Sequence, residues 1–228
     1  MNIAENLQIV LEKIYSSEIR AGRPPGSVKL IAVTKTVPAE KINEAISAGA
    51  GIIGENRVNE LVQKKDALLP VEKHMIGVLQ TNKVKYLIGE AAMIHSVDRP
   101  GLLREIARQC AKKDAVMPIL LEVRIGGESG KSGVDPGKLP VLVEEALGFP
   151  ELRLCGLMCV PPPAAGDIAR AYFSQLREVF EKIKSDYSQN LQYFSELSMG
   201  MSGDFEEAVQ EGATFVRVGS AIFGARVR

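Results

Sequence analysis

The chain has 228 residues, of which 46% are hydrophobic and 25% are charged, and this composition is typical of a globular domain. Its 28 basic and 28 acidic side chains cancel to a formal net charge of zero. Broad binding to nucleic acid or to a membrane surface would predict a basic excess, so the composition argues against both partners.

Cysteine usage and the N-terminus bear on the compartment. Cys110, Cys155 and Cys159 cannot all pair within one chain, and buried free thiols are predicted in preference to a disulfide or a metal site. Residues Met1–Glu5 show no basic region followed by an apolar run, so we expect no signal peptide. Both features favour a cytoplasmic protein.

In chain order, one amphipathic helix is followed by alternating strands and helices. The spacing of apolar residues predicts the first helix over Asn2–Ala21, and a run of glycine and proline at 22–26 ends it. The predicted strands are Val28–Val33, Gly51–Gly54, His74–Ile76, Ala92–His95, Val116–Ile125, Leu152–Met158, Phe194–Leu197 and Thr214–Val218. The predicted helices between them are Pro38–Ala48, Asn56–Ala67, Thr81–Ile88, Arg99–Lys113, Pro136–Leu147, Asp167–Lys184 and Gly203–Gln210.

This alternation indicates the fold class. Strands that alternate with helices form a parallel sheet with right-handed crossovers. Eight such units in about 200 residues favour an α/β fold that closes as a (β/α)8 TIM barrel, with one extra N-terminal helix and a single domain over residues 1–228. An open, doubly wound sheet is the alternative.

Lys35 follows the first predicted strand. Strand alternation places Ile31, Val33 and Lys35 on one face, so the lysine is expected to point inward at the C-terminal mouth, where such barrels carry their sites. Burial disfavours an ammonium group and lowers its pKa, and the neutral amine attacks aldehydes. The position suggests a Schiff base, and a lysine that reaches solvent at the rim is the alternative.

Two segments rich in glycine and serine follow the seventh and eighth predicted strands, where barrels commonly hold phosphate. The first is Ser198–Gly203, and the second is Gly219-Ser220. Glycines let the backbone approach an anion closely, and N–H groups at a helix start favour it. Either loop alone is compatible with an ordinary turn. Together, opposite an inward lysine, they describe a site for pyridoxal 5′-phosphate (PLP).

Arg217 is the third element of the predicted site. Alternation in the last strand puts it on the same face as Phe215, so it should reach the mouth of the barrel. There it is placed to hydrogen-bond the pyridine nitrogen of PLP, to keep that nitrogen unprotonated and to weaken the cofactor as an electron sink. An arginine–carboxylate pair at the strand end is the alternative.

Two further patterns do not predict sites of their own. Residues Gly126–Ser132 look like a phosphate-binding P-loop, but Ile125 occupies the position of its first glycine, so the motif fails. Lys131 stays a candidate for contact with an anion. His74 and His95 have no carboxylate or cysteine cluster at ligand spacing, so no metal site is predicted.

The residues resemble those of the YggS-type PLP homeostasis proteins, also called the proline synthetase co-transcribed homologue family. The resemblance extends over nearly the whole chain in family order, and the long runs near the C-terminus are highly specific. The matching runs are Ala32–Thr36, Gly54–Asn56, His74–Gly77, Leu79–Lys83, Lys131–Gly133, Gly156–Met158, Leu197–Ser202 and Val216–Gly224.

The resemblance implies a barrel like the N-terminal domain of alanine racemase and PLP held as a Schiff base on Lys35. It implies a role in intracellular vitamin B6 and amino-acid homeostasis without accepted catalytic turnover. We expect a monomer whose partners are PLP-accepting apo-enzymes. The cofactor contacts it implies come from Lys35, Asn56, Ser198, Met199, Gly200, Arg217, Gly219 and Ser220. Arg57, Val78 and Arg124 depart from many relatives on loops around the mouth, which bears on ligand or partner preference.

A small PLP enzyme such as an amino-acid racemase is the alternative function. Racemisation needs an acid–base group on each face of the α-carbon. Lys35 serves one face, whereas in alanine racemase the other group is a tyrosine that a second domain positions. No second domain is expected here, and the five tyrosines lie away from the predicted mouth. A phosphate-sugar enzyme, in which Lys35 attacks a ketose or aldose, is a third alternative and predicts no chromophore.

Overall fold

The computed structural model describes residues 2–127 and 132–224. Its strands are β1 (Lys29–Val33), β2 (Ile52–Glu55), β3 (Glu72–Met75), β4 (Met93–Val97), β5 (Met117–Glu122), β6 (Leu152–Met158), β7 (Glu196–Ser198) and β8 (Phe215–Val218). They pair in parallel in chain order, and β8 closes on β1. The closed barrel confirms the predicted fold class and excludes the open sheet.

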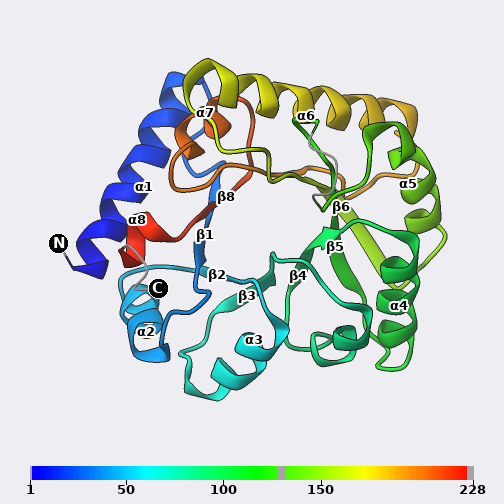
Figure 1. The fold of residues 1–228 in the computed structure, drawn as a ribbon, viewed down its shortest axis with the longest axis horizontal. Coiled ribbons are helices and arrows are strands. Elements are labelled where there is room, and N and C mark those ends of the chain that lie inside the picture. The colour runs from blue at the N-terminus through cyan, green and yellow to red at the C-terminus, as the bar shows by residue number, and fades with distance from the viewer. Residues whose placement is uncertain (1, 128–131, 225–228) are drawn as a thin grey trace.

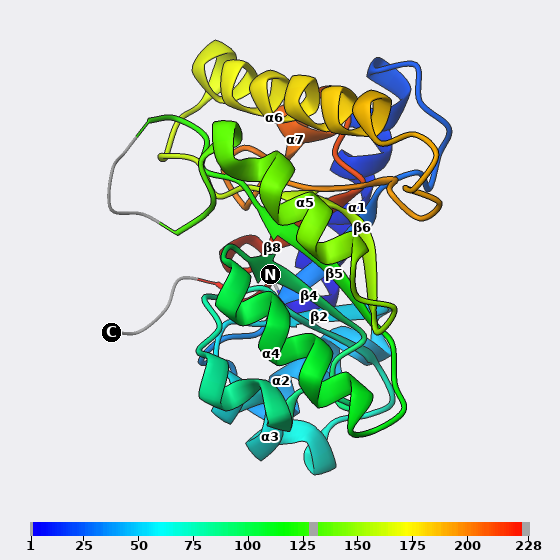
Figure 2. The same ribbon diagram turned by 90° about the vertical axis from the view of Figure 1, so that its right-hand side faces the viewer.

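Helices surround the barrel on the outside (Figures 1 and 2). They are α1 (Ile3–Arg20), α2 (Ala39–Ser47), α3 (Val58–Lys64), α4 (Pro100–Ala111), α5 (Leu139–Leu147), α6 (Gly166–Asp186), α7 (Phe205–Gln210) and α8 (Ser220–Phe223), with short 3₁₀ helices η1 (Lys65–Ala67), η2 (Thr81–Tyr86) and η3 (Pro136–Lys138). The predicted N-terminal helix is confirmed as α1, which lies beside α7 and α8 near the end of the chain. In the described part of the chain, no helix has the length and apolar content needed to cross a membrane.

Several predicted bounds differ from the structure, and three of the differences have a clear physical reason. The predicted helix Thr81–Ile88 is the 3₁₀ helix η2, because threonine, asparagine, valine and tyrosine are weak α-helix formers and the segment is short. Strand β5 ends before Ile125, because the chain turns back after it and Val123 bridges to Val134. Strand β7 begins two residues later than predicted, and Phe194 instead stacks on Phe180 of α6 at 4.6 Å between ring centroids.

The hydrophobic core has three parts. The largest part lies between the strands and the surrounding helices. Two smaller clusters lie apart from it: one of Ile31, Val33, Ile76 and Phe215 in the barrel interior, and one of Leu120, Cys155 and Met158 on β5 and β6. The inward alternation predicted for β1 and β8 is therefore confirmed, and it carries the chain beyond β1 toward the C-terminal mouth at Lys35.

Candidate functional site

A cavity of about 380 Å³ opens at the C-terminal ends of the strands, where barrels carry their sites. Five of the predicted site residues line it: Lys35, Asn56, Arg217, Gly219 and Ser220. Apolar side chains of the barrel interior form part of its wall. The volume falls in the range usual for small-molecule sites. The structure thus brings together residues from β1, β2 and β8 that are far apart in the sequence.

A buried ion pair holds the residue before Lys35. Thr34 is fully buried, its Oγ1 donates to Glu55 Oε1 at 2.8 Å, and its carbonyl oxygen accepts from Lys64 Nζ at 3.0 Å. Lys64 Nζ also donates to Glu55 Oε1 at 2.9 Å. Burial raises the pKa of the Glu55 carboxyl, and the hydrogen bonds from Lys64 and Thr34 oppose that rise.

Thr36, the residue after Lys35, is linked to Lys64 through a second carboxylate, that of Glu60. Thr36 has a φ of 63°, which is unusual for a β-branched residue. Its N–H donates to Glu60 Oε2 at 2.7 Å, and Lys64 Nζ donates to the same oxygen at 3.0 Å. Both peptide groups that flank Lys35 are therefore tied to Lys64 and its partners, and a strained residue follows the candidate nucleophile, as is common at functional sites.

Replacing Lys64 with methionine is expected to lower the free energy of unfolding by about 3 kcal/mol, because the buried Glu55 loses its cation. The matched control is Lys182→Met, whose pair with Asp186 is exposed (72% and 45% exposed side chains), against 16% and 2% for Lys64 and Glu55. The control should cost less than about 1 kcal/mol. Urea unfolding measures both, and equal losses would contradict a structural role for Lys64.

Arg217 is buried beneath the cavity, with 4% of its surface exposed. Its Nη1 donates to Ser198 Oγ at 2.7 Å and its Nη2 donates to the carbonyl oxygen of Cys159 at 2.8 Å. Burial lowers the pKa of the guanidinium, and nearby Glu122 and Asp204 oppose that shift. Among the described residues its hydrogen-bond partners are a hydroxyl and a carbonyl, so the alternative of an arginine–carboxylate pair is not observed. Arginine stays protonated at neutral pH.

The three site residues predicted after β7 lie one layer behind the cavity. Ser198 and Met199 are fully buried, and the Met199 side chain packs in the outer core. Gly200 has a φ of +90°, and a Cβ there would lie 2.5 Å from the Ala208 Cβ. Position 200 therefore requires glycine, because of both its positive φ and the close packing around it. A direct phosphate contact from these three residues stays a prediction.

The residues of this loop that line the cavity are Met201, Ser202 and Gly203. The N–H of Gly219 donates to Ser202 Oγ at 3.2 Å, so the loops after β7 and β8 are joined at the cavity wall. All three belong to the predicted phosphate loop, but they are not among the residues predicted to contact the cofactor. The glycine- and serine-rich run up to Gly203 is the signal that points to them.

Asn56 carries a buried polar atom at the cavity. Its Oδ1 has no hydrogen-bond partner among the described residues, although a buried acceptor left unpaired costs about 1–3 kcal/mol. Asn56 also lines the cavity. The atom therefore marks a place where a ligand can donate a hydrogen bond.

The departures from the family pattern lie around this cavity without lining it. Arg57 and Val78 are exposed on the loops after β2 and β3. Arg124 Nη2 lies 3.4 Å from Asp135 Oδ2. Lys131, the candidate for an anion contact in the rejected P-loop, lies outside the described residues.

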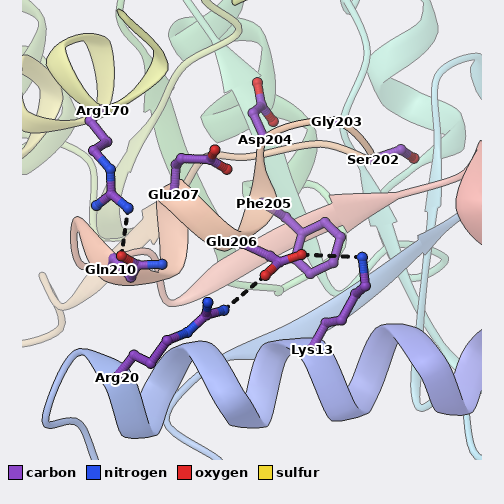
Figure 3. A pocket seen from close by; sticks show the side chains of 10 residues that line it. All are labelled: Lys13, Arg20, Arg170, Ser202, Gly203, Asp204, Phe205, Glu206, Glu207 and Gln210. Carbon is purple, nitrogen blue, oxygen red and sulfur yellow. Dashed lines mark hydrogen bonds and ion pairs between the residues drawn. The ribbon is translucent and has the colours of Figure 1, made fainter. Parts of the chain in front are cut away.

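A second hollow, of about 330 Å³, lies on the outer side of the loop after β7, between α1, α6 and α7 (Figure 3). Several of its polar side chains hydrogen-bond or form ion pairs across it. Glu206 accepts from Lys13 at 3.2 Å and from Arg20 at 2.8 Å, and Arg170 Nη2 donates to Gln210 Oε1 at 2.6 Å. These contacts join the helices that enclose the loop.

The class of barrel follows from comparison with known proteins. The model of the alanine racemase N-terminal domain matches residues 6–227. Alanine racemase of Clostridium difficile shares the fold, with a TM-score of 0.73 at 12% identity over 98% of this chain and 61% of that chain. The chain is thus a barrel of the alanine racemase N-terminal type.

The full-length relatives define the family within this class. The pyridoxal phosphate homeostasis protein of Aquifex aeolicus is 45% identical over 99% of both chains. The structure of PipY from Synechococcus elongatus with PLP bound has a TM-score of 0.84 at 34% identity, over 98% of this chain and 100% of that one. The chain belongs to the family of pyridoxal phosphate homeostasis proteins.

Proposed function

We propose that the protein binds PLP, holds it as a Schiff base on Lys35, and serves the homeostasis of PLP without catalytic turnover. The observation that carries the proposal is that an amine, a buried guanidinium and two serine–glycine loops surround one cavity. The family relationship supports it, because PipY was solved with PLP bound.

The residues present fit this cofactor. When bound, PLP supplies an aldehyde for an amine and an electron-withdrawing ring. Lys35 provides the amine, whose nitrogen forms the C=N bond while the aldehyde oxygen leaves as water. The hydroxyls of Ser202 and Ser220 and the backbone of Gly219 suit a phosphate group, which needs several donors. The unpaired Oδ1 of Asn56 accepts a further hydrogen bond.

Arg217 favours a carrier over an enzyme. A guanidinium donates hydrogen bonds and does not give up its proton near neutral pH, so it leaves a facing ring nitrogen unprotonated. An unprotonated pyridine withdraws electrons less strongly, which disfavours removal of an α-proton from a bound amino acid. In addition, none of the five tyrosines, all within the described residues, lines the cavity.

The test against the racemase alternative is α-proton exchange in deuterium oxide. The PLP-loaded protein, incubated with L-alanine and monitored by proton NMR, should exchange the α-proton no faster than the same concentration of free PLP. A second acid–base group at the cavity would give repeated turnovers of exchange or formation of D-alanine. Either result would replace the carrier with an enzyme.

We infer further that the protein is a cytoplasmic monomer that hands PLP to apo-enzymes. The state of the thiols supports this compartment. Cys110, Cys155 and Cys159 are free and buried. Burial raises the pKa of the first two to about 11 and that of Cys159 to about 12, so little reactive thiolate forms.

A further inference from the structure

Two buried histidines occupy the barrel interior below the cavity, and they are the only two histidines of the chain. His74 on β3 and His95 on β4 are both fully buried, with ring centroids 4.9 Å apart. Each ring centroid lies 5.5 Å from that of Phe215 on β8, which presents its ring edge-on. Neither histidine lines the Lys35 cavity, so the proposed function leaves them without a role.

The histidines belong to a continuous chain of hydrogen bonds through the barrel. His74 Nε2 lies 2.6 Å from Glu72 Oε1, at the start of β3, and His74 Nδ1 lies 2.9 Å from His95 Nε2. His95 Nδ1 lies 2.9 Å from Ser198 Oγ, which accepts from Arg217 Nη1 at 2.7 Å. The chain therefore connects the N-terminal mouth of the barrel with the guanidinium at the cavity.

The two ends of this chain fix its direction. A guanidinium only donates hydrogen bonds, and a carboxylate only accepts them. The proton between Glu72 and His74 must therefore sit on His74 Nε2, which leaves Nδ1 of a neutral His74 as an acceptor. His95 then donates from Nε2 and accepts at Nδ1 from the Ser198 hydroxyl. Every polar atom along this path has a partner, whereas the reverse direction would set a histidine lone pair against the carboxylate.

Burial favours the neutral form of both rings. Burial lowers the pKa of His74 and places that of His95 well below its ordinary value. Glu72 and Glu196 raise the His74 pKa, and Lys29 lowers it. For His95, the neighbouring His74 and Arg217 lower the pKa further.

We propose that His74 and His95 are positioning residues: as neutral Nε2–H tautomers they form a one-directional hydrogen-bond chain from Arg217 to Glu72, which fixes the guanidinium that faces the cofactor. With its own proton directed to His95, Ser198 Oγ keeps its lone pairs available to accept from Arg217. The hydrogen-bond chain is argued from the described contacts alone, whereas its effect on bound PLP rests on the proposed function.

The first test is nitrogen-15 NMR of the two rings in the protein without PLP. Because only two histidines exist, single His74→Gln and His95→Gln variants assign the signals. At neutral pH both rings should show a protonated Nε2 and an accepting Nδ1, and each ring should titrate below the ordinary histidine pKa, His95 further below it than His74. A protonated Nδ1 on either ring, or a titration near 6.5, would overturn the proposal.

The second test measures whether a change at Glu72 reaches His95 through the hydrogen-bond chain. Glu72→Ala should shift the ring nitrogens of His95, although among the described residues the Glu72 carboxylate hydrogen-bonds to His74 and not to His95. Glu72→Gln, which keeps an acceptor oxygen, should restore most of the original shifts. Glu151→Ala removes a carboxylate just before β6 that, within the described part of the protein, makes no hydrogen bond to any member of the hydrogen-bond chain, and it should leave both rings unchanged. Unchanged His95 signals in Glu72→Ala would contradict a connected chain.

The third test separates this proposal from the proposed function. Addition of PLP to the native protein should shift His95 Nδ1, and Glu72→Ala should alter the absorbance spectrum of the bound cofactor. Stoichiometric PLP binding without either change would refute the positioning role while leaving the proposed function intact. If no PLP binds, the proposed function fails, and the cofactor part of this proposal fails with it.

Discussion

The Lys35→Ala variant is expected to lose all covalently attached PLP, from one adduct per chain to none, while the fold is kept. Lys35 is the one described lysine that lines the cavity, and alanine cannot form a C=N bond. Its side chain is only half-buried, so its removal opens no void in the hydrophobic core. Borohydride reduction followed by mass measurement counts the adduct, and thermal unfolding checks the fold.

Lys41→Ala is the matched control, because Lys41 is exposed on α2 and lies away from the cavity. The control should keep the full adduct. If Lys35→Ala retained a reducible adduct at full occupancy, a different lysine would be the anchor and the cavity would lose its assignment.

Replacing Arg217 is expected to have the second largest effect. The Arg217→Glu change puts a buried carboxylate against the carbonyl oxygen of Cys159 and removes the donor to Ser198, which should cost about 3–5 kcal/mol of folding free energy. Bound PLP should also absorb differently, because glutamate accepts a hydrogen bond where arginine donates one. Chemical unfolding and absorbance spectra measure the two effects.

Arg217→Gln keeps the result interpretable if the glutamate variant does not fold. Glutamine is neutral and can still donate to one of the two partners, so the fold should survive. Loss of a charge-assisted hydrogen bond to the ring, worth about 1.5–3 kcal/mol, corresponds to PLP binding about 10- to 100-fold weaker. An unchanged dissociation constant and an unchanged spectrum in both variants would rule out contact between Arg217 and the ring.

The parts of the site that follow from local periodicity could be predicted from the sequence. Strand alternation places Ile31 and Val33 in the barrel interior with Lys35 beyond them, and it puts Phe215 and Arg217 on one face. These arguments need only the residues of one strand. They hold because a strand buried in a closed barrel must present alternate residues to the inside.

The parts that depend on distant contacts could not be predicted. The partner of His95 Nδ1 lies 103 residues away in sequence, and the two histidines are 21 residues apart, so their hydrogen-bond chain has no local signal. Lys64 likewise reaches back 30 residues to the Thr34 carbonyl. Thr36 adopts a positive φ that β-branched residues disfavour, so its own residue type does not predict it. Its N–H is held there by Glu60, a residue distant in sequence.

The loop after β7 shows how a small shift of a strand changes a site. The glycine- and serine-rich run correctly predicts a loop, but the strand extends through Ser198 rather than ending at Leu197. Ser198 therefore becomes part of the barrel wall beside Arg217, and the cavity is lined by Met201–Gly203. Strand ends depend on pairing with neighbouring strands, which composition does not encode.

The most direct measurement is the absorbance spectrum of the purified native protein loaded with PLP, before and after borohydride, with peptide mass mapping of the reduced product. We expect a Schiff-base band that disappears on reduction and a single PLP adduct on the peptide that carries Lys35. A protein that stays colourless and takes up no added PLP, or an adduct on any other lysine, would contradict it.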